Sequence, residues 1–289
     1  MVRLSLIAPT IRSLVIGDRI NEKDISQYLS SASNLESLTF RYSNDKISGE
    51  CLLSAREKLS SLTIFGSVYW WEVSNRFINK MMEAIKQKKL KLTTLTFNCR
   101  GIKQDTLNLI NDTRLINTLT SLSFKRPPLY SPEMRLIDLK PLINFINLTE
   151  LHLAVFPFVD DTLINKILID LKRLESLTIR IPVSNFHPLI TDSSIDNVSS
   201  KSSKLKLINF QNLRISDNCI KKLINLKELN SLTLEDVNIS KLDTIPEIIK
   251  KSPLTKLVIK QCFNMSSYQL NQMINQIINA AKDEVSQKK

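Results

Sequence analysis

The sequence predicts an α/β solenoid, a stack of short units in which each strand is followed by a helix. One motif, apolar-x-x-apolar-x-apolar, recurs ten times along the 289 residues, and helical apolar spacing follows several of its copies. The chain is 43% hydrophobic but only 6% aromatic, and it holds just 4 Gly, so Leu and Ile must build the core. No stretch has the composition of a linker. We therefore expect one repeat domain over 1–289, with repeats over about 4–280 and a polar tail over 282–289.

The ten copies of the motif define the period of the repeat. Nine steps cover the 243 residues from Leu14 to Leu257, a mean of 27. That period lies within the roughly 20–29 residues of leucine-rich repeats. The middle residues of the copies are Leu14, Leu38, Leu62, Leu95, Leu122, Leu151, Leu177, Ile208, Leu232 and Leu257.

Each copy of the motif places its last two apolar residues two positions apart, on one face of a short strand. Apolar residues at i, i+3 and i+4 after the strand predict an amphipathic helix. One such unit cannot bury its own apolar surface, so stacking is required. We expect a leucine-rich-repeat horseshoe of about ten repeats, with a parallel β-sheet on the concave face and helices on the convex face. The helical patterns are Ile25/Leu29, Leu107/Ile110, Leu163/Ile167, Ile220/Leu223/Ile224 and Leu270/Met273/Ile274/Ile277, the last within a final helix at about 267–281.

Several units continue past the strand into an I-x-D-x-x-L/I element. Ile215–Ile220 is one example, and Asp161 and Asp192 lie in two others, where Asp or Ser can cap the next helix. The last unit places Cys262 where cysteine-containing repeats have a cysteine. On these residues the chain resembles the repeat region of F-box/leucine-rich-repeat proteins, which are ribonuclease-inhibitor-like in fold. The resemblance implies substrate recognition for a ubiquitin ligase. No segment here resembles an F-box, so a cullin-ligase adaptor is implied as a partner only if an F-box lies elsewhere.

The net charge of +12, from 40 basic and 28 acidic residues, allows a second function. Lysines cluster at 86–91, 201–206, 221–222 and 250–251. We interpret them as solvated faces that keep a long solenoid soluble. The alternative is a basic solenoid that binds nucleic acid or anionic lipid surfaces. Inhibition of an enzyme, as by ribonuclease-inhibitor-like repeats, is a third hypothesis, but those concave faces are acid-rich and this one is neutral to basic.

The strand residues between the buried positions point into the concave hollow. Two of the three columns are mostly Ser and Thr, which suit strands and a crowded inner radius. The third column is chemically varied and includes four cations. We predict that a protein partner binds the concave face at Arg41, Phe65, Asn98, Lys125, His152, Arg180, Gln211, Glu235, Lys256 and Lys260.

No constellation of residues predicts catalysis, so we expect a protein that is not an enzyme and holds no cofactor or metal. There is no GxGxxG, P-loop or HExxH motif. His152 would share a column with Ser123 and Thr178 but lacks an orienting acid, and His187 belongs to a loop. Tyr69-Trp70-Trp71 suits a binding hot spot or, in our preferred interpretation, loop-to-helix packing.

The cysteines and the chain ends bear on location. Four cysteines stand far apart with no CxxC pair, which favours a reducing compartment over disulfides or zinc. No signal-peptide pattern and no apolar run of about 18 residues occurs, so we expect no membrane span and a cytoplasmic or nuclear protein. The first unit has no obvious polar cap, which suggests a helper segment or a further N-terminal domain.

Overall fold

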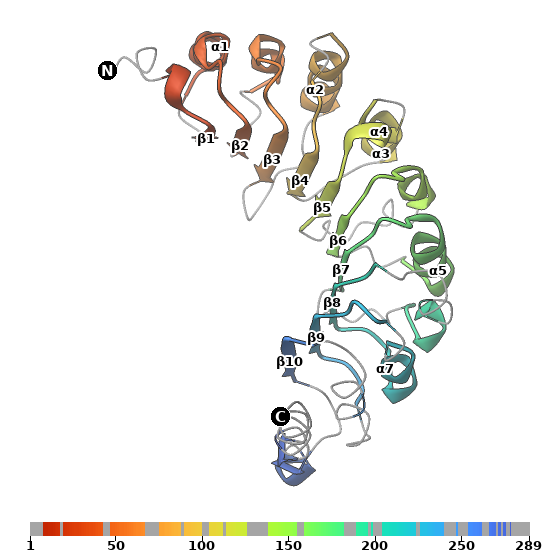
Figure 1. Cartoon of the computed structure of the whole chain (residues 1–289). Coiled ribbons are helices and arrows are strands. Elements are labelled where there is room, and N and C mark those ends of the chain that lie inside the picture. Colours follow the sequence, from red (N-terminus) through yellow and green to blue (C-terminus); the bar gives the residue numbers. More distant parts are fainter. Residues whose placement is uncertain are drawn as a thin grey trace. The chain divides into compact units, whose positions relative to one another are not determined.

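The computed structural model describes most of the chain and divides it into two compact units, residues 1–148 and 149–289. The strands and helices of both units are drawn in Figure 1. Among the described residues, no helix is long and apolar enough to cross a bilayer. The described ranges are 8–17, 20–42, 47–66, 75–87, 90–99, 104–111, 114–125, 138–154, 159–181, 189–195, 198, 204–223, 226–239, 247, 254–261, 266–269, 271–272, 274–275 and 278.

Among the residues that the structure describes, unit 1 has five parallel strands that pair in sequence order, each on a copy of the motif. In-register pairing aligns Ser13, Ser37, Ser61, Thr94 and Ser121 at the strand starts. The strands are β1 (Ser13–Ile16), β2 (Ser37–Tyr42), β3 (Ser61–Gly66), β4 (Thr94–Asn98) and β5 (Ser121–Phe124).

Unit 2 repeats this arrangement with five more parallel strands in sequence order. Glu150, Ser176, Leu207, Ser231 and Lys256 align at the strand starts. The strands are β6 (Glu150–Ala154), β7 (Ser176–Arg180), β8 (Leu207–Gln211), β9 (Ser231–Glu235) and β10 (Lys256–Lys260). All ten copies of the motif therefore form parallel strands, as predicted.

Within each unit the helices lie on one side of the strands (Figure 1). The predicted helices at Ile25, Leu107, Leu163 and Ile220 are confirmed as α1, α3, α5 and α7. Of the expected final helix, 267–269, 271–272, 274–275 and 278 are helical, while Leu270, Met273 and Ile277 lie outside the described residues. The elements are η2 (Ala8–Thr10), α1 (Glu22–Ser31), η3 (Glu50–Ser54), α2 (Asn75–Gln87), α3 (Gln104–Asn111), α4 (Leu115–Thr118), η5 (Lys140–Asn144), α5 (Asp161–Asp170), η6 (Asp192–Ile195) and α7 (Asp217–Leu223).

The core of each unit lies between the sheet and its helices. The second and fourth residues of the inner strands are almost fully buried; Leu38 and Phe40, for example, are each 0% exposed. Phe40 meets Phe77 of α2 edge-on, with ring centroids 5.4 Å apart. Each buried side chain of this size contributes about 1.5–3 kcal/mol relative to leaving it exposed. The repeat motif thus supplies the sheet side of the core, and apolar residues of the helices and turns supply the other side.

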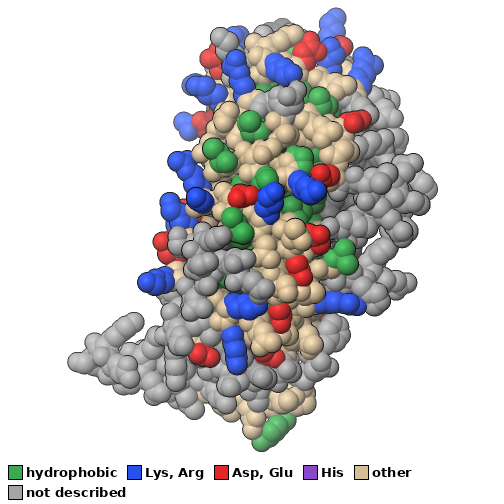
Figure 2. Space-filling view, turned by 90° about the vertical axis from the view of Figure 1, so that its right-hand side faces the viewer, with side chains coloured by type: hydrophobic (Ala, Val, Ile, Leu, Met, Phe, Trp, Pro, Cys, Tyr) green, Lys and Arg blue, Asp and Glu red, His purple; other side chains and the backbone are tan. Residues whose placement is uncertain are grey.

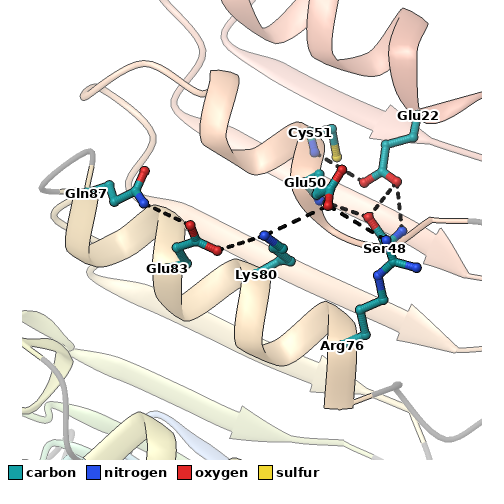
Figure 3. A network of polar contacts seen from close by, with 8 residues as sticks. All are labelled: Glu22, Ser48, Glu50, Cys51, Arg76, Lys80, Glu83 and Gln87. Carbon is teal, nitrogen blue, oxygen red and sulfur yellow. Dashed lines mark hydrogen bonds and ion pairs between the residues drawn. The ribbon is translucent and has the colours of Figure 1, made fainter.

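Acidic side chains at helix starts join neighbouring repeats in unit 1. Glu22, the first residue of α1, accepts hydrogen bonds through Oε2 from the backbone N–H (2.9 Å) and Oγ (2.8 Å) of Ser48. Its Oε1 accepts from the N–H of Cys51 at 3.2 Å. Figure 3 shows this carboxylate between the two repeats, beside ion pairs that link Glu50 to Lys80 (3.8 Å). Glu22 therefore pairs backbone groups that the next turn leaves without a helical partner.

Unit 2 has the same arrangement, in which an acidic side chain near the start of one helix accepts hydrogen bonds from the next repeat. We call this series of bonds the ladder. Asp161 at the start of α5 accepts from the N–H of Thr191 at 2.6 Å and from its hydroxyl. Asp192, which follows Thr191, accepts from the N–H of Ser216 at 2.6 Å and from its hydroxyl. The expectation that Asp161 caps its own helix is wrong: the cap of α5 is the residue before it, Asp160, whose Oδ1 accepts from Leu163 N at 2.8 Å. Asp161 and Asp192 themselves bond to the next repeat.

The ladder makes stability depend on pH through Glu22. Burial alone would raise the pKa of its carboxyl, but hydrogen bonds from Ser48 and Cys51 outweigh burial and hold the pKa below its ordinary 4.5. The carboxylate's contribution is therefore complete above about pH 4.5 and is lost as pH falls through the lowered pKa. Glu22→Gln should cost about 1 kcal/mol at pH 7, and the difference from wild type should shrink at pH 3.5.

Urea unfolding at the two pH values measures this difference. The control is Glu57→Gln, which removes an exposed carboxylate and should change stability little at either pH. A Glu22→Gln deficit that stays constant with pH would contradict the assignment.

Candidate partner-binding face

Each sheet has one face that carries no helices, called here the open face. It displays the first, third and fifth positions of each strand, because alternate side chains point to opposite faces. On β3 the exposure alternates along the strand, with Leu62 and Ile64 buried and Thr63 and Phe65 half-buried. The residues predicted to bind a partner lie on this face in both units.

In unit 1 the fifth positions form a row of unlike side chains. Arg41 pairs with Phe65, and Phe65 pairs with Asn98, on neighbouring strands. Lys125 extends the row, because its N–H donates to the carbonyl of Phe97 at 2.8 Å. Arg41 and Lys125 are exposed, whereas Phe65 and Asn98 are half-buried. Since neighbouring strands lie about 4.8 Å apart, the two cations stand roughly 14 Å apart with an aromatic and an amide between them.

The fifth positions of unit 2 form a second row in the same register. Ala154 pairs with Arg180, Arg180 with Gln211, Gln211 with Glu235, and Glu235 with Lys260. The last four residues of this row are polar. Arg180 and Lys260, at the two ends of the four, are exposed, and Gln211 and Glu235 between them are half-buried. The Nε2 of Gln211 donates to Oδ1 of Asn209, in the adjacent row, at 3.3 Å. This row presents both signs of charge.

Two of the predicted residues lie on the open face but outside these rows. His152 occupies a third position and pairs with Thr178. Lys256 occupies a first position and pairs with Ser231. The structure thus collects eight of the ten predicted residues into two fifth-position rows and sets His152 and Lys256 beside the row of unit 2.

The third positions of the strands, mostly Thr and Ser, form a row of small side chains beside the fifth-position rows on the same face. In unit 1 Thr96 is 7% and Ser123 8% exposed, and in unit 2 Thr178 is 9% exposed. Such small side chains fill the space between strands, so the longer fifth-position side chains project beyond them. Val15, for which the sequence predicted no role, differs from the rest of this row: it is apolar and 52% exposed, and it pairs with Thr39. Its signal was an apolar residue where the neighbouring copies have Thr or Ser.

The described residues offer no other centre for chemistry. No three His, Cys, Asp or Glu side chains gather there as a metal site would require. Burial raises the pKa of the Cys219 thiol, and burial together with the nearby Glu22 carboxylate raises that of Cys51, so neither favours the reactive thiolate. The residues Tyr69-Trp70-Trp71, His187 and Cys262 lie outside the described residues.

Comparison with known proteins places the fold. No family model and no curated protein matches the chain. Among solved structures, a chain of the Rad7 and Elc1 complex in yeast is similar over 94% of this chain and 76% of its own, with a TM-score of 0.58 and 16% identity. An internalin (inlF) from Listeria monocytogenes covers 93% of this chain and 86% of its own, at TM-score 0.47 and 17% identity. A chain of the TLR13–ssRNA13 complex covers 87% and 36%, at TM-score 0.49 and 18% identity. The likeness to the first structure, together with ten parallel strands on ten copies of one motif, shows an α/β leucine-rich-repeat solenoid.

Proposed function

We propose that the chain is a non-catalytic scaffold that binds a protein partner on its open face. The observation that carries the proposal is the pair of fifth-position rows, in which chemically different side chains lie in register beside a row of small, packed Thr and Ser side chains. Hydrogen bonds between neighbouring strands already occupy the backbone N–H and C=O groups of the inner strands. A partner must therefore be recognised by projecting side chains rather than by backbone groups.

The row of unit 1 suggests the chemistry of the partner. Phe65 is a half-buried aromatic anchor between strands that carry the exposed cations Arg41 and Lys125. Aromatic residues and Arg dominate binding hot spots, and a half-buried ring is already ordered before binding. An apolar side chain flanked by carboxylates would match this row. The row of unit 2 adds Arg180, Glu235 and Lys260, which can form ion pairs with a partner surface that carries both signs of charge.

A finer part of the proposal is substrate recognition for an F-box-type ubiquitin ligase. It rests on the family resemblance of the repeats, which implies a cullin-ligase adaptor in the same assembly. The similar yeast chain was solved in a complex of Rad7 with Elc1, which gives a precedent for protein binding by this fold. Recovery of such an adaptor with the chain, from the cell that makes it, is the expected result.

Charge reversal on the open face tests the site. In the open-face variant Arg41, Lys125, Arg180 and Lys260 become Glu, and we expect at least a tenfold loss of partner affinity, because one lost charge pair costs about 1.4 kcal/mol or more. The matched helix variant reverses four exposed helix lysines, which gives the same change in net charge: Lys23, Lys86, Lys166 and Lys221. Affinity purification with mass spectrometry identifies partners, and titration with the purified partner measures the loss.

A photo-crosslinking residue placed at Phe65 tests whether the partner contacts the open face at this position. It should join the chain to the same partner, while the same residue at Lys23 on α1 should not. Equal loss of the partner in both charge variants, or crosslinks only from α1, would overturn the open face as the binding site.

A further inference from the structure

The first and the last strand differ from the eight strands between them at the third position. The outer two, β1 and β10, hold Val15 and Val258 there, so both place Leu-Val-Ile at their second to fourth positions. The inner strands hold a polar residue at the third position: Thr39, Thr63, Thr96, Ser123, His152, Thr178, Asn209 and Thr233.

The backbone of β1 has unpaired hydrogen-bonding groups along one edge. β1 (Figure 1) pairs with β2 on one side, and no residue that the structure describes pairs with its other side. The carbonyl of Arg12 accepts from the N–H of Ser37 at 2.9 Å and so points toward β2. Successive residues of a strand direct their backbone groups to opposite sides. Ser13 and Val15 therefore direct N–H and C=O to the free edge, where the described residues offer them no partner.

The first repeat also leaves apolar side chains uncovered. Val15 is 52% exposed, and Ile20, just before α1, is 39% exposed. They are two of the three large hydrophobic side chains that are exposed among the described residues of unit 1. Leu14 is half-buried, although its counterparts Leu38 and Leu62 are 0% and 1% exposed. Unpaired backbone groups beside apolar side chains are the combination that pairs with another strand.

The helix-bearing side is a poorer surface for self-association. Figure 2 shows Lys and Arg side chains interspersed with Asp and Glu on this side, with the hydrophobic side chains in small groups between them. Small apolar groups of this kind are normal on the surface of a protein and need no partner.

Charge sets β1 apart from β10, an edge strand of unit 2. β10 has the sequence Lys-Leu-Val-Ile-Lys, and both lysines are exposed. Antiparallel pairing of two copies of β10 about Val258 would place Lys256 of one copy opposite Lys260 of the other, where like charges repel. Lysines on an edge strand protect proteins from such pairing. β1 has the sequence Ser-Leu-Val-Ile and carries no charge, so its edge lacks this protection.

The sequence of β1 is self-complementary in an antiparallel pair centred on Val15. In this register Val15 of one copy lies opposite Val15 of the other, and Leu14 lies opposite Ile16. The free N–H and C=O groups of Val15 then bond to each other across the centre, as in a hydrogen-bonded antiparallel pair. Opposite residues lie on the same face, so each apolar side chain meets an apolar side chain. Centring the pair on Leu14 instead would place Arg12 opposite Ile16.

We infer that β1 pairs with β1 of a second copy of this chain, and that the two sheets join across a twofold axis at Val15. A closed pair that uses the same surface on both copies is the commonest assembly of soluble proteins. The contact is at an edge of the sheet and does not depend on the protein partner proposed for the open face. Because β1 has only four residues, the interface belongs at the small end of specific contacts, about 1,200 Å². We therefore expect a dimer that dissociates on dilution.

Sedimentation velocity of the whole chain over a range of concentrations tests the inference. Val15→Lys places two like charges opposite each other at the axis and should weaken dimerisation about tenfold or more. Position 15 is exposed, so the fold should tolerate the lysine. The control Thr63→Lys adds the same charge at the third position of β3, roughly 12 Å from the axis. That distance exceeds the screening length of about 8 Å at physiological ionic strength, so the control should dimerise as the wild type does.

A disulfide tests the register. Val15→Cys sets two thiols opposite each other on strands whose Cα atoms lie about 5.5 Å apart, within the roughly 4.4–6.8 Å that a disulfide spans. Mild oxidation should convert this variant to a covalent dimer on a denaturing gel. Ser13→Cys is the control, because in this register the two copies of residue 13 lie roughly 13 Å apart. The native cysteines are the same in both variants, and Cys51, Cys99 and Cys219 are buried.

Each outcome supports or overturns the dimer. Concentration-dependent dimers that Val15→Lys weakens, with a covalent dimer from Val15→Cys alone, support it. A wild type that stays monomeric, or equal crosslinking of the two cysteine variants, overturns it. Species that grow beyond a dimer would point to head-to-tail pairing of β10 with β1 and overturn the twofold pair. Far-ultraviolet circular dichroism checks that each variant is folded, and retention of the protein partner by Val15→Lys shows that the open face is intact.

Discussion

Phe97→Ala is expected to lower the free energy of unfolding by about 3–5 kcal/mol, the range for a large aromatic removed from a packed core. Phe97 lies at the fourth position of β4 and is 0% exposed. Its ring stacks on that of Phe124 on β5, with centroids 5.6 Å apart and planes 6° apart. The substitution removes the burial of a ring, leaves a cavity beneath the sheet and ends the contact with Phe124. Chemical denaturation followed by circular dichroism measures the loss.

Phe65→Ala on the neighbouring strand is the control for that experiment. Phe65 lies on β3 one residue after Ile64 and faces the open side of the same sheet. It is only half-buried, so its removal should cost about 1 kcal/mol or less while weakening partner binding. If the two substitutions cost the same stability, the assignment of the two faces of the sheet is wrong.

Asp192→Ala is expected to cost about 2–3 kcal/mol. The carboxylate accepts from both the N–H and the hydroxyl of Ser216, so its removal leaves two donors at the start of α7 without their partner. Hydrogen bonds to charged groups contribute about 1.5–3 kcal/mol, and partly buried donors left unpaired add their desolvation cost.

A double-mutant cycle with Ser216→Ala isolates this interaction. The double variant should lose less than the sum of the two single losses, because the hydroxyl bond is already absent from each of them. Additive losses would show that Asp192 stabilises the unit through another contact. Asp192→Asn keeps an acceptor oxygen and should recover part of the stability.

The strands were predictable because their signal is local and repeated. A pair of apolar residues two apart recurs ten times, and from β2 to β9 both residues of the pair are buried, whereas on the end strands Leu14, Leu257 and Ile259 are half-buried. Helix α2 was not predicted, although Phe77, Ile78, Met81, Met82 and Ile85 have helical spacing and are all buried. The 13 residues of α2 account for part of the 33-residue step from the third to the fourth copy.

Other features depend on residues far apart in the sequence. Some units close with 3-10 turns such as η3 and η6 rather than longer helices, and neither periodicity nor repeat length distinguishes these units. The ladder joins Asp161 to Thr191 and Asp192 to Ser216, 30 and 24 residues apart, with spacings that follow no fixed rule. Likewise, lysines at equivalent turns look alike in sequence, but Lys58 bonds to Asn34 while Lys204 has no such partner among the described residues.

The ladder of unit 2 has a consequence for how its repeats unfold. Thr191 donates to Asp161 in the repeat before it and is followed by Asp192, which accepts from Ser216 in the repeat after it. Ser216 and Asp217 occupy the same two places one unit on. Where a folded repeat meets an unfolded one, the hydrogen bonds from one of these carboxylates must be broken, together with the strand pairing beside them. Each boundary is therefore costly, and a chain of such units favours few boundaries. The amide protons of Thr191 and Ser216 should exchange with solvent together, at the rate of the whole segment rather than of one turn.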